Sequence, residues 1–311
     1  MNMKTVSPPS LWALILKKSL FIYLPLAGCI FLSNYWLPDD LTPTVSSRFA
    51  PLNYEYYELC GPFTVGPILP RLLRVENNNH DKPYIKKPEG PTKAQVALII
   101  DDVGYNPSIL REIAKIPIPL SWAVLPYSPF AKECLREAET HGFEIILHLP
   151  LEPLDHTRNP GPGVIRRNWN ETEIERQLTK NLEAVPGAIG VNNHMGSLGT
   201  QDPHLMACLM KIIGEKGLFF IDSRTTAASV AEQYALEYQV PYARRHVFID
   251  NDNDPISKKA ALRQLIKIAL QEGSAIGIAH VKEGNAAVIA ATLPEFKKAG
   301  VEFVPISEVM K

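Results

Sequence analysis

From residue 94 onward, short apolar runs alternate with longer segments of mixed apolar and polar residues. The runs have the length of β-strands, and the segments between them are long enough for helices. There are about eight strand candidates, at residues 96–100, 120–125, 143–147, 189–191, 218–221, 247–249, 275–279 and 301–304. Strands that alternate with helices pair in parallel, so the pattern predicts an α/β fold in the form of a barrel of βα units.

Three of the intervening segments carry clear helix signals. Residues 132–140 end at His141 and Gly142, a helix stop signal. Residues 171–182 follow a cap-like Asn170 and place their apolar side chains on one face. Residues 257–271 end before Gly273, a typical helix terminator, and the predicted buried face holds Leu262, Leu265, Ile266 and Leu270.

Six of the apolar runs lead to a residue that can bind a metal or move a proton. These residues are Asp101 with Asp102, His148, His194, Asp222, Asp250 and His280. In a barrel of parallel strands, the carboxyl ends of the strands converge on one face, where the chemistry takes place. The sequence therefore predicts an enzyme with a site made of carboxylates and imidazoles.

Asp101 and Asp102 stand directly after the first buried run. Two adjacent anions raise each other's pKa, so the pair is costly unless a cation or a proton relieves the repulsion. With a metal present, one carboxylate can be a ligand while the other takes a proton from water. The alternative interpretation is a pair that caps the following helix.

The histidines extend this site. Pro150 and Pro153 rule out a regular helix after His148, and His194 lies among Asn192, Asn193 and Gly196. A lone histidine is more often structural than a ligand. Several at strand ends fit zinc, which takes two or three nitrogen or oxygen ligands from the protein and keeps one position open.

Asp222, Arg224 and His280 complete the list of candidates. Asp222 is a candidate to orient a metal-binding histidine without itself binding the metal. Arg224 is a candidate to anchor the carboxylate of Asp222 or to bind substrate. A purely structural ion pair between the two is the open alternative. His280 is the candidate general acid.

Composition narrows the class of protein. The chain has 311 residues, 46% of them hydrophobic, with 32 Lys and Arg against 33 Asp and Glu. The chain can bury a sizeable core, and it lacks the basic stripe with which a protein binds nucleic acid. Cys134 and Cys208 fall in predicted helices as buried thiols, while the state of Cys60 stays open. No Cys/His spacing typical of a structural zinc module occurs.

The amino-terminal part predicts attachment to a membrane. Lys17 and Lys18 precede an apolar stretch at residues 19–37, which is long enough to span a bilayer and is followed by acidic residues. Residues 1–37 are therefore read as a cytoplasmic tip with a membrane anchor or signal, and the body of the protein as periplasmic, held at the inner membrane. Residues 26–29 also look like a lipobox, in which Cys29 is lipidated. A buried core helix is the third alternative.

Residues 38–93 are predicted to be a linker, because prolines interrupt them throughout and no hydrophobic period is sustained. The catalytic domain is predicted to cover residues 94–311.

Several motifs in this domain resemble those of a known family. Ile100 to Asp102, Gly142 to His148 and Ile276 to His280 resemble the NodB-type polysaccharide deacetylases. His148 to Pro153, Val191 to Ser197 and Asp222 to Thr225 look specifically like the divergent polysaccharide deacetylase family of bacterial envelopes. The resemblance implies a distorted (β/α) barrel that holds a divalent metal, usually zinc, and removes N- or O-acetyl groups from a glycan such as peptidoglycan.

The resemblance also implies roles for individual residues. Asp102 matches the metal-binding aspartate, Asp101 the base, His148 the first histidine of the metal motif, and His280 the acid. Glu152 stands where the motif has its second histidine, so His194 becomes the candidate third ligand. In the implied mechanism Asp101 takes a proton from water, and the metal, aided by Arg224 or a backbone N–H, stabilises the oxyanion.

Two other functions stay open on the sequence. A hydrolase of another ester, such as a phosphoester, uses the same metal chemistry. The other is a noncatalytic module that binds peptidoglycan or an envelope protein partner. It fits the presence of Glu152 in place of a ligand histidine and the predicted linker at residues 38–93.

Overall fold

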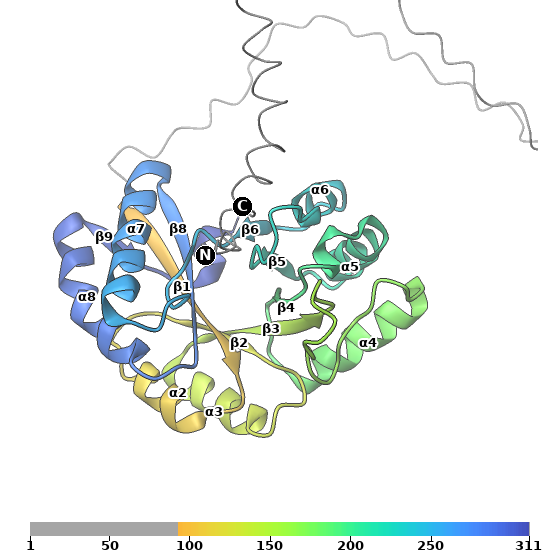
Figure 1. Cartoon of the computed structure of the whole chain (residues 1–311), viewed down its shortest axis with the longest axis horizontal. Coiled ribbons are helices and arrows are strands. Elements are labelled where there is room, and N and C mark those ends of the chain that lie inside the picture. The colour runs from red at the N-terminus through yellow and green to blue at the C-terminus, as the bar shows by residue number, and fades with distance from the viewer. Residues whose placement is uncertain (1–92, 311) are drawn as a thin grey trace, which may run out of the picture. The chain divides into compact units, whose positions relative to one another are not determined.

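The computed structural model describes residues 93–310. Its strands are β1 (Ala94–Val103), β2 (Ser121–Val124), β3 (Glu144–Leu151), β4 (Gly190–Met195), β5 (Phe219–Asp222), β6 (Tyr242–Arg244), β7 (Val247–Phe248), β8 (Ser274–His280) and β9 (Val301–Phe303). Its helices are α2 (Pro107–Ala114), α3 (Ala131–His141), α4 (Glu171–Ala184), α5 (Pro203–Glu215), α6 (Ala231–Glu237), α7 (Pro255–Glu272) and α8 (Asn285–Ala299). Figure 1 shows the helices arranged around the strands.

The strands form one sheet in the order β6-β5-β4-β3-β2-β1-β8-β7, and β9 pairs with the start of β1. Each of these pairings is parallel. No described pairing joins β6 to β7, so the barrel is open at this seam, where Arg245 and His246 connect the two strands. The predicted distorted (β/α) barrel is confirmed.

All eight predicted strands are present among the described residues, and β6 is the one that the sequence did not reveal. Its three residues, Tyr242–Arg244, form no apolar run because the strand lies at an edge of the sheet. The helix predictions hold for α3, α4 and α7. Asn170 and Glu173 form a capping box at the start of α4, and Gly273 ends α7 in the left-handed conformation.

One detail of the helix prediction is wrong. Leu270 is 55% exposed, because the buried stripe of α7 continues from Leu262 through Leu265 and Ile266 to Ala269. Cys134 and Cys208 are buried and free, as predicted.

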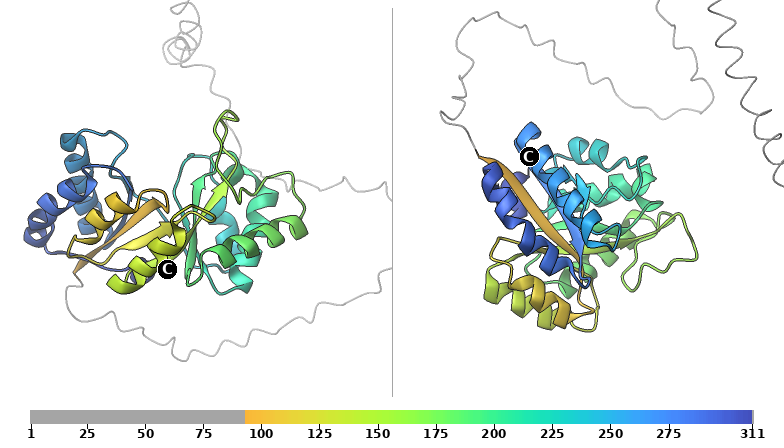
Figure 2. Two further views of the ribbon diagram at one scale, coloured as in Figure 1. Left: turned by 90° about the horizontal axis from the view of Figure 1, so that it is seen from below. Right: turned by 60° about the vertical axis from the view of Figure 1, so that its left-hand side comes forward.

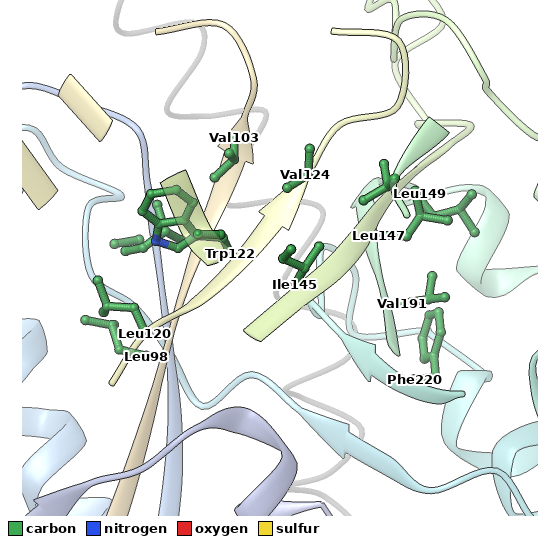
Figure 3. Packing of buried hydrophobic residues seen from close by; sticks show 14 of the residues in the cluster. Leu98, Val103, Leu120, Trp122, Val124, Ile145, Leu147, Leu149, Val191 and Phe220 are labelled. Atoms are coloured by element: carbon green, nitrogen blue, oxygen red, sulfur yellow. The ribbon is translucent and has the colours of Figure 1, made fainter. Parts of the chain in front are cut away.

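The two faces of the sheet bury different residues. The outer face packs against the helices, and α7 and α8 cover the part next to β1, β8 and β9 (Figure 2). Figure 3 shows buried side chains of this outer cluster along the strands, among them Leu98, Trp122, Leu147 and Phe220. The inner face forms a second cluster that includes Ala97, Ile99, Ile146, Ile221 and Ile278. Because side chains alternate along a strand, these two clusters fix which strand-end residues point into the barrel.

Several predictions fall outside the described residues. They are the anchor at residues 1–37, lipidation at Cys29, the state of Cys60, and all of the 38–93 linker except Lys93. Within residues 93–310, no helix is both long and apolar enough to cross a bilayer.

Candidate active site

Strand alternation brings most of the predicted site residues together. Residues two apart on a strand point to the same face of the sheet. Asp101, His148 and His280 each lie two residues after an apolar residue of the inner cluster, namely Ile99, Ile146 and Ile278, so their side chains point into the barrel. His194 lies two residues after the buried Asn192 on β4. Asp222 directly follows the inward-facing Ile221, so its side chain points to the helix side instead.

Asp101 and Asp102 both reach the site although adjacent strand residues normally point in opposite directions. The register of β1 against β2 is irregular between Ile100 and Val103, and Asp102 has a φ of 60°. A bulge and a left-handed residue together turn both carboxylates toward the same place. A non-glycine residue in this conformation is strained, and such strain concentrates at functional sites.

Asp102, His148 and His194 form a close triangle of ligand atoms. Oδ1 of Asp102 lies 3.3 Å from Nε2 of His148 and 3.0 Å from Nδ1 of His194, and the two nitrogens are 3.1 Å apart. Ligands at ~2.0–2.2 Å from a tetrahedral zinc ion lie about 3.3 Å from one another. Oδ1 of Asp102 is also buried without a hydrogen-bond partner. One oxygen and two nitrogens in this arrangement fit a divalent metal.

The electrostatics of the triangle favour a cation. Burial alone raises the pKa of Asp102, but the neighbouring imidazoles of His148 and His194 outweigh burial and hold the pKa far below its usual range. Burial alone lowers the pKa of His148, but the charges of Asp101 and Asp102 raise it above its ordinary value. The site thus attracts positive charge, and a metal ion held by these three ligands would take the place of the proton.

Asp101 is placed as a base beside this triangle. It is 2% exposed, and its Oδ2 lies 3.7 Å from Nε2 of His148. Burial raises the pKa of Asp101 even though the charges of His148 and His280 act in the opposite direction. A carboxylate with a raised pKa accepts a proton more readily than an ordinary aspartate, as a general base must.

Asn192 is a site residue that the sequence prediction missed. Its Oδ1 lies 2.8 Å from Nδ1 of His148, and its Nδ2 donates to Oδ1 of Asp101 at 2.8 Å. The amide oxygen therefore keeps the proton of His148 on Nδ1 and leaves Nε2 free to bind a metal. Asn192 is the first residue after the apolar run 189–191, which was the available signal.

His280 is paired with Asp250, for which the sequence suggested no role beyond its place at a strand end. Nδ1 of His280 lies 2.8 Å from Oδ1 of Asp250, and the backbone N–H of His280 donates to Oδ2 at 3.0 Å. Asn285 also donates to this carboxylate, at 2.8 Å. These bonds hold the pKa of Asp250 below its usual range against the effect of burial.

Asp222 and Arg224 do not take the predicted places. Asp222 accepts from the backbone N–H of Arg224 at 2.7 Å and from the hydroxyl of Tyr242 at 3.4 Å. Its carboxylate has no described contact with a histidine, because it lies on the outer face of β5. Asn192, and not Asp222, orients His148. The Arg224 guanidinium forms no ion pair among the described residues.

Glu152 is occupied elsewhere. Its carboxylate accepts from Nη1 of Arg166 at 3.0 Å and from the backbone N–H of Arg167 at 2.9 Å. These contacts close the loop that follows β3. The second imidazole of the triangle comes from β4, as His194, instead of from the position of Glu152.

A pocket of about 320 Å³ opens beside the triangle, and its lining residues are Asp102, Tyr105, Asn106, Leu125, Asn159, Pro160, Gly161, His194 and Val281. Its size is at the lower end of the range of small-molecule sites, about 300–1,000 Å³. A larger pocket of about 750 Å³ beside α8 and β9 is lined by none of the site residues. The smaller pocket is therefore the one with access to the candidate chemistry.

The fold and the site define a class of protein: a parallel α/β half-barrel whose carboxyl edge carries an Asp–His–His cluster, a buried aspartate and a His–Asp pair. The chain belongs to the divergent polysaccharide deacetylase family, whose family model matches residues 98–310. The resemblance seen in the sequence motifs is confirmed.

Relatives of the chain extend the comparison. An uncharacterized protein of Haemophilus influenzae is 35% identical over 201 residues, which cover 65% of this chain and 71% of that protein. The uncharacterized protein YibQ of Escherichia coli is 34% identical over 187 residues, which cover 60% of this chain and 58% of that protein. The solved structure of the uncharacterized protein ATU2773 from Agrobacterium tumefaciens matches with a TM-score of 0.67 and 24% identity, over 71% of this chain and 90% of that one. It shows the same fold.

Proposed function

We propose that this protein is a metal-dependent hydrolase that removes acetyl groups from an envelope polysaccharide. The observation that carries the proposal is the triangle of Asp102, His148 and His194, with ligand atoms 3.0–3.3 Å apart. Zinc is accepted by a set of one carboxylate and two imidazoles with an open position. The family to which the chain belongs supports an acetylated glycan as the substrate.

The residues in and around the triangle have different roles in the proposed hydrolysis. Asp102, His148 and His194 would hold a divalent cation, which would supply Lewis acidity for the activation of water and the polarisation of the acyl carbonyl. Asp101 accepts the proton of the attacking water, and Asn192 holds that carboxylate and His148 in place. His280, oriented by Asp250, donates a proton to the departing amine or alcohol.

The same geometry weighs against the noncatalytic alternative. That alternative rests on the replacement of a ligand histidine by Glu152 and on the predicted linker, and His194 lies where it can supply the missing imidazole. A base and an acid remain beside the triangle, which a binding module does not need. The phosphoester alternative shares the metal chemistry, so the released product must separate the two reactions.

The predicted amino-terminal anchor or lipidated Cys29 supports an extracytoplasmic location. We therefore place the reaction at the periplasmic side of the inner membrane, where peptidoglycan and other acetylated glycans are accessible.

The test uses the purified full-length protein. Metal content is measured together with acetate release from an N-acetylglucosamine oligomer and from an O-acetylated glycan, and with phosphate release from a sugar phosphate. We expect near-stoichiometric zinc and acetate from one of the two glycans, with both lost in His148→Ala and in His194→Ala. The matched control is His141→Ala, since His141 bonds only to its own helix. Phosphate release without acetate, or a folded protein that takes up no divalent metal, overturns the proposal.

A further inference from the structure

Arg245 lies at the seam of the barrel, directly after β6. Its backbone N–H donates to the carbonyl of Asp222 at 2.9 Å. Its Nε donates to the carbonyl of Ser223 at 2.7 Å, and its Nη2 to that of Arg224 at 3.1 Å. The end of β5 therefore fixes both the backbone and the guanidinium of this residue.

This guanidinium has no ion-pair partner among the described residues. It is half-buried, and burial lowers the pKa of Arg245 against the attraction of Asp222 and Asp101. A partly desolvated cation without a carboxylate partner is costly. Closing the seam of the barrel is therefore not a sufficient reason for a guanidinium at this position.

The guanidinium of Arg245 contacts the ring of Phe248, and Phe248 in turn contacts His280. The central carbon of the guanidinium lies 3.6 Å from the centroid of the Phe248 ring. Phe248 in turn stacks on the imidazole of His280, with centroids 5.6 Å apart and planes at 28°. Asp250 holds His280 at Nδ1. The imidazole is thus held at one edge by a carboxylate and on one face by an aromatic ring that also contacts the guanidinium of Arg245.

We propose that Arg245 is a positioning residue, which acts through Phe248 to hold the imidazole of His280 in the orientation needed to protonate the leaving group. This inference rests on the proposed function, in which His280 is the general acid. An acid must keep its proton within hydrogen-bond reach of the leaving atom, and small misplacements are costly. A planar guanidinium can stack on Phe248 and bond two carbonyls at once, which a lysine cannot do.

The leaving group provides the test. Protonation matters for a sugar amine or alcohol, whereas the nitrophenolate of 4-nitrophenyl acetate leaves without a proton. We expect Arg245→Met to lose about tenfold more activity on the acetylated glycan than on the nitrophenyl ester. In a His280→Ala background the same change should cost nothing further, because the two residues act as one unit. Arg244→Met is the matched control, as Arg244 is the exposed neighbour.

A second readout needs no turnover. The His280 Nδ1 proton shared with Asp250 should give a downfield NMR resonance that broadens in Arg245→Met and persists in Arg244→Met. Equal losses on both substrates together with an unchanged resonance overturn the inference. If Arg245→Met does not fold, Phe248→Leu removes the same stack and must show the same selective loss. If the wild type releases no acetate, the proposed function fails, and the resonance alone decides whether Arg245 positions His280.

Discussion

Nδ1 of His148 lies 2.8 Å from Oδ1 of Asn192, and the same amide donates to Asp101. One buried side chain therefore sets the tautomer of a candidate metal ligand and the orientation of the candidate base. A carboxylate in place of the amide has no N–H for Asp101, and it adds a third negative charge to a pair already under strain.

Replacement of Asn192 is expected to weaken metal binding. In Asn192→Ala, His148 loses the acceptor that keeps its proton on Nδ1, and loss of such a partner typically costs about 10–100-fold in metal affinity. Competition with a zinc-sensitive dye measures this directly. Asn168→Ala, at an exposed position, serves as the control. Wild-type affinity in Asn192→Ala would show that the amide does not orient the ligand.

Glu152 is expected to matter for stability and not for metal. Glu152→Ala removes two hydrogen bonds, one of them from the charged Arg166, so we expect the free energy of unfolding to fall by about 1–2 kcal/mol. Zinc content should stay at the wild-type level, in contrast to His194→Ala. Urea titration and metal analysis of the same preparations check both statements. Loss of zinc from a well-folded Glu152→Ala protein would make Glu152 a ligand after all.

The strand-end pattern predicted that most of the candidate residues lie close together, for a simple geometric reason. Parallel strands separated by helices bring their carboxyl ends to one edge, so residues as distant as Asp102 and His194 meet without any specific signal between them. The same fact predicted the place of His280.

The alternation of side chains along each strand decided which of the other strand-end residues face the candidate site. Asp222 follows an inward-facing Ile221 and points outward, whereas Asn192 follows an outward-facing Val191 and points inward. An apolar run without alternation does not reveal which face is which, so the sequence favoured the wrong residue. The bulge that lets both Asp101 and Asp102 face inward is likewise set by tertiary pairing. Arg245 follows a three-residue edge strand with no apolar run, and nothing local marked it.

The His280–Asp250 pair is expected to make the proposed activity dependent on pH. Burial alone lowers the pKa of His280, but the hydrogen bond to Asp250 and the charge of Asp101 raise it above its ordinary value of 6.5. A general acid must be protonated, so activity should fall as the pH rises through this raised pKa. Asp250→Asn removes the charge, and we expect the alkaline limb of the pH–rate profile to move to lower pH.

The same pair makes stability dependent on pH. The contribution of His280 is complete below pH 6.5 and is lost as the pH rises through its raised pKa, while that of Asp250 is complete above pH 3.8 and is lost as the pH falls through its lowered pKa. The stability difference between wild type and Asp250→Asn should therefore be largest between these two values. Denaturant titrations across the pH range measure it, with the exposed Asp252→Asn as control. A difference that is constant with pH would contradict the pairing.

Lys258 connects the loop that contains Asp250 with the loop that follows His280. It is 1% exposed, and its Nζ donates to Oδ1 of Asn253 at 3.0 Å and to the carbonyl of Glu283 at 3.3 Å. Asn253 follows Asp250 in the loop after β7, and Glu283 follows His280 in the loop after β8. Lys258→Met keeps the apolar stem but leaves these acceptors without their partner, so we expect a loss of about 1–3 kcal/mol in the free energy of unfolding.

The neighbouring Lys259 offers a matched comparison. It pairs with Glu295 at 3.2 Å on the surface of α7, where ion pairs contribute little, so Lys259→Met should unfold almost as the wild type does. Hydrogen exchange adds a local readout, because Lys258→Met should speed exchange in the two loops before it affects the central strands. Equal stability of the two variants, with unchanged exchange in both loops, would show that the buried ammonium does not hold the Asp250 and His280 loops together.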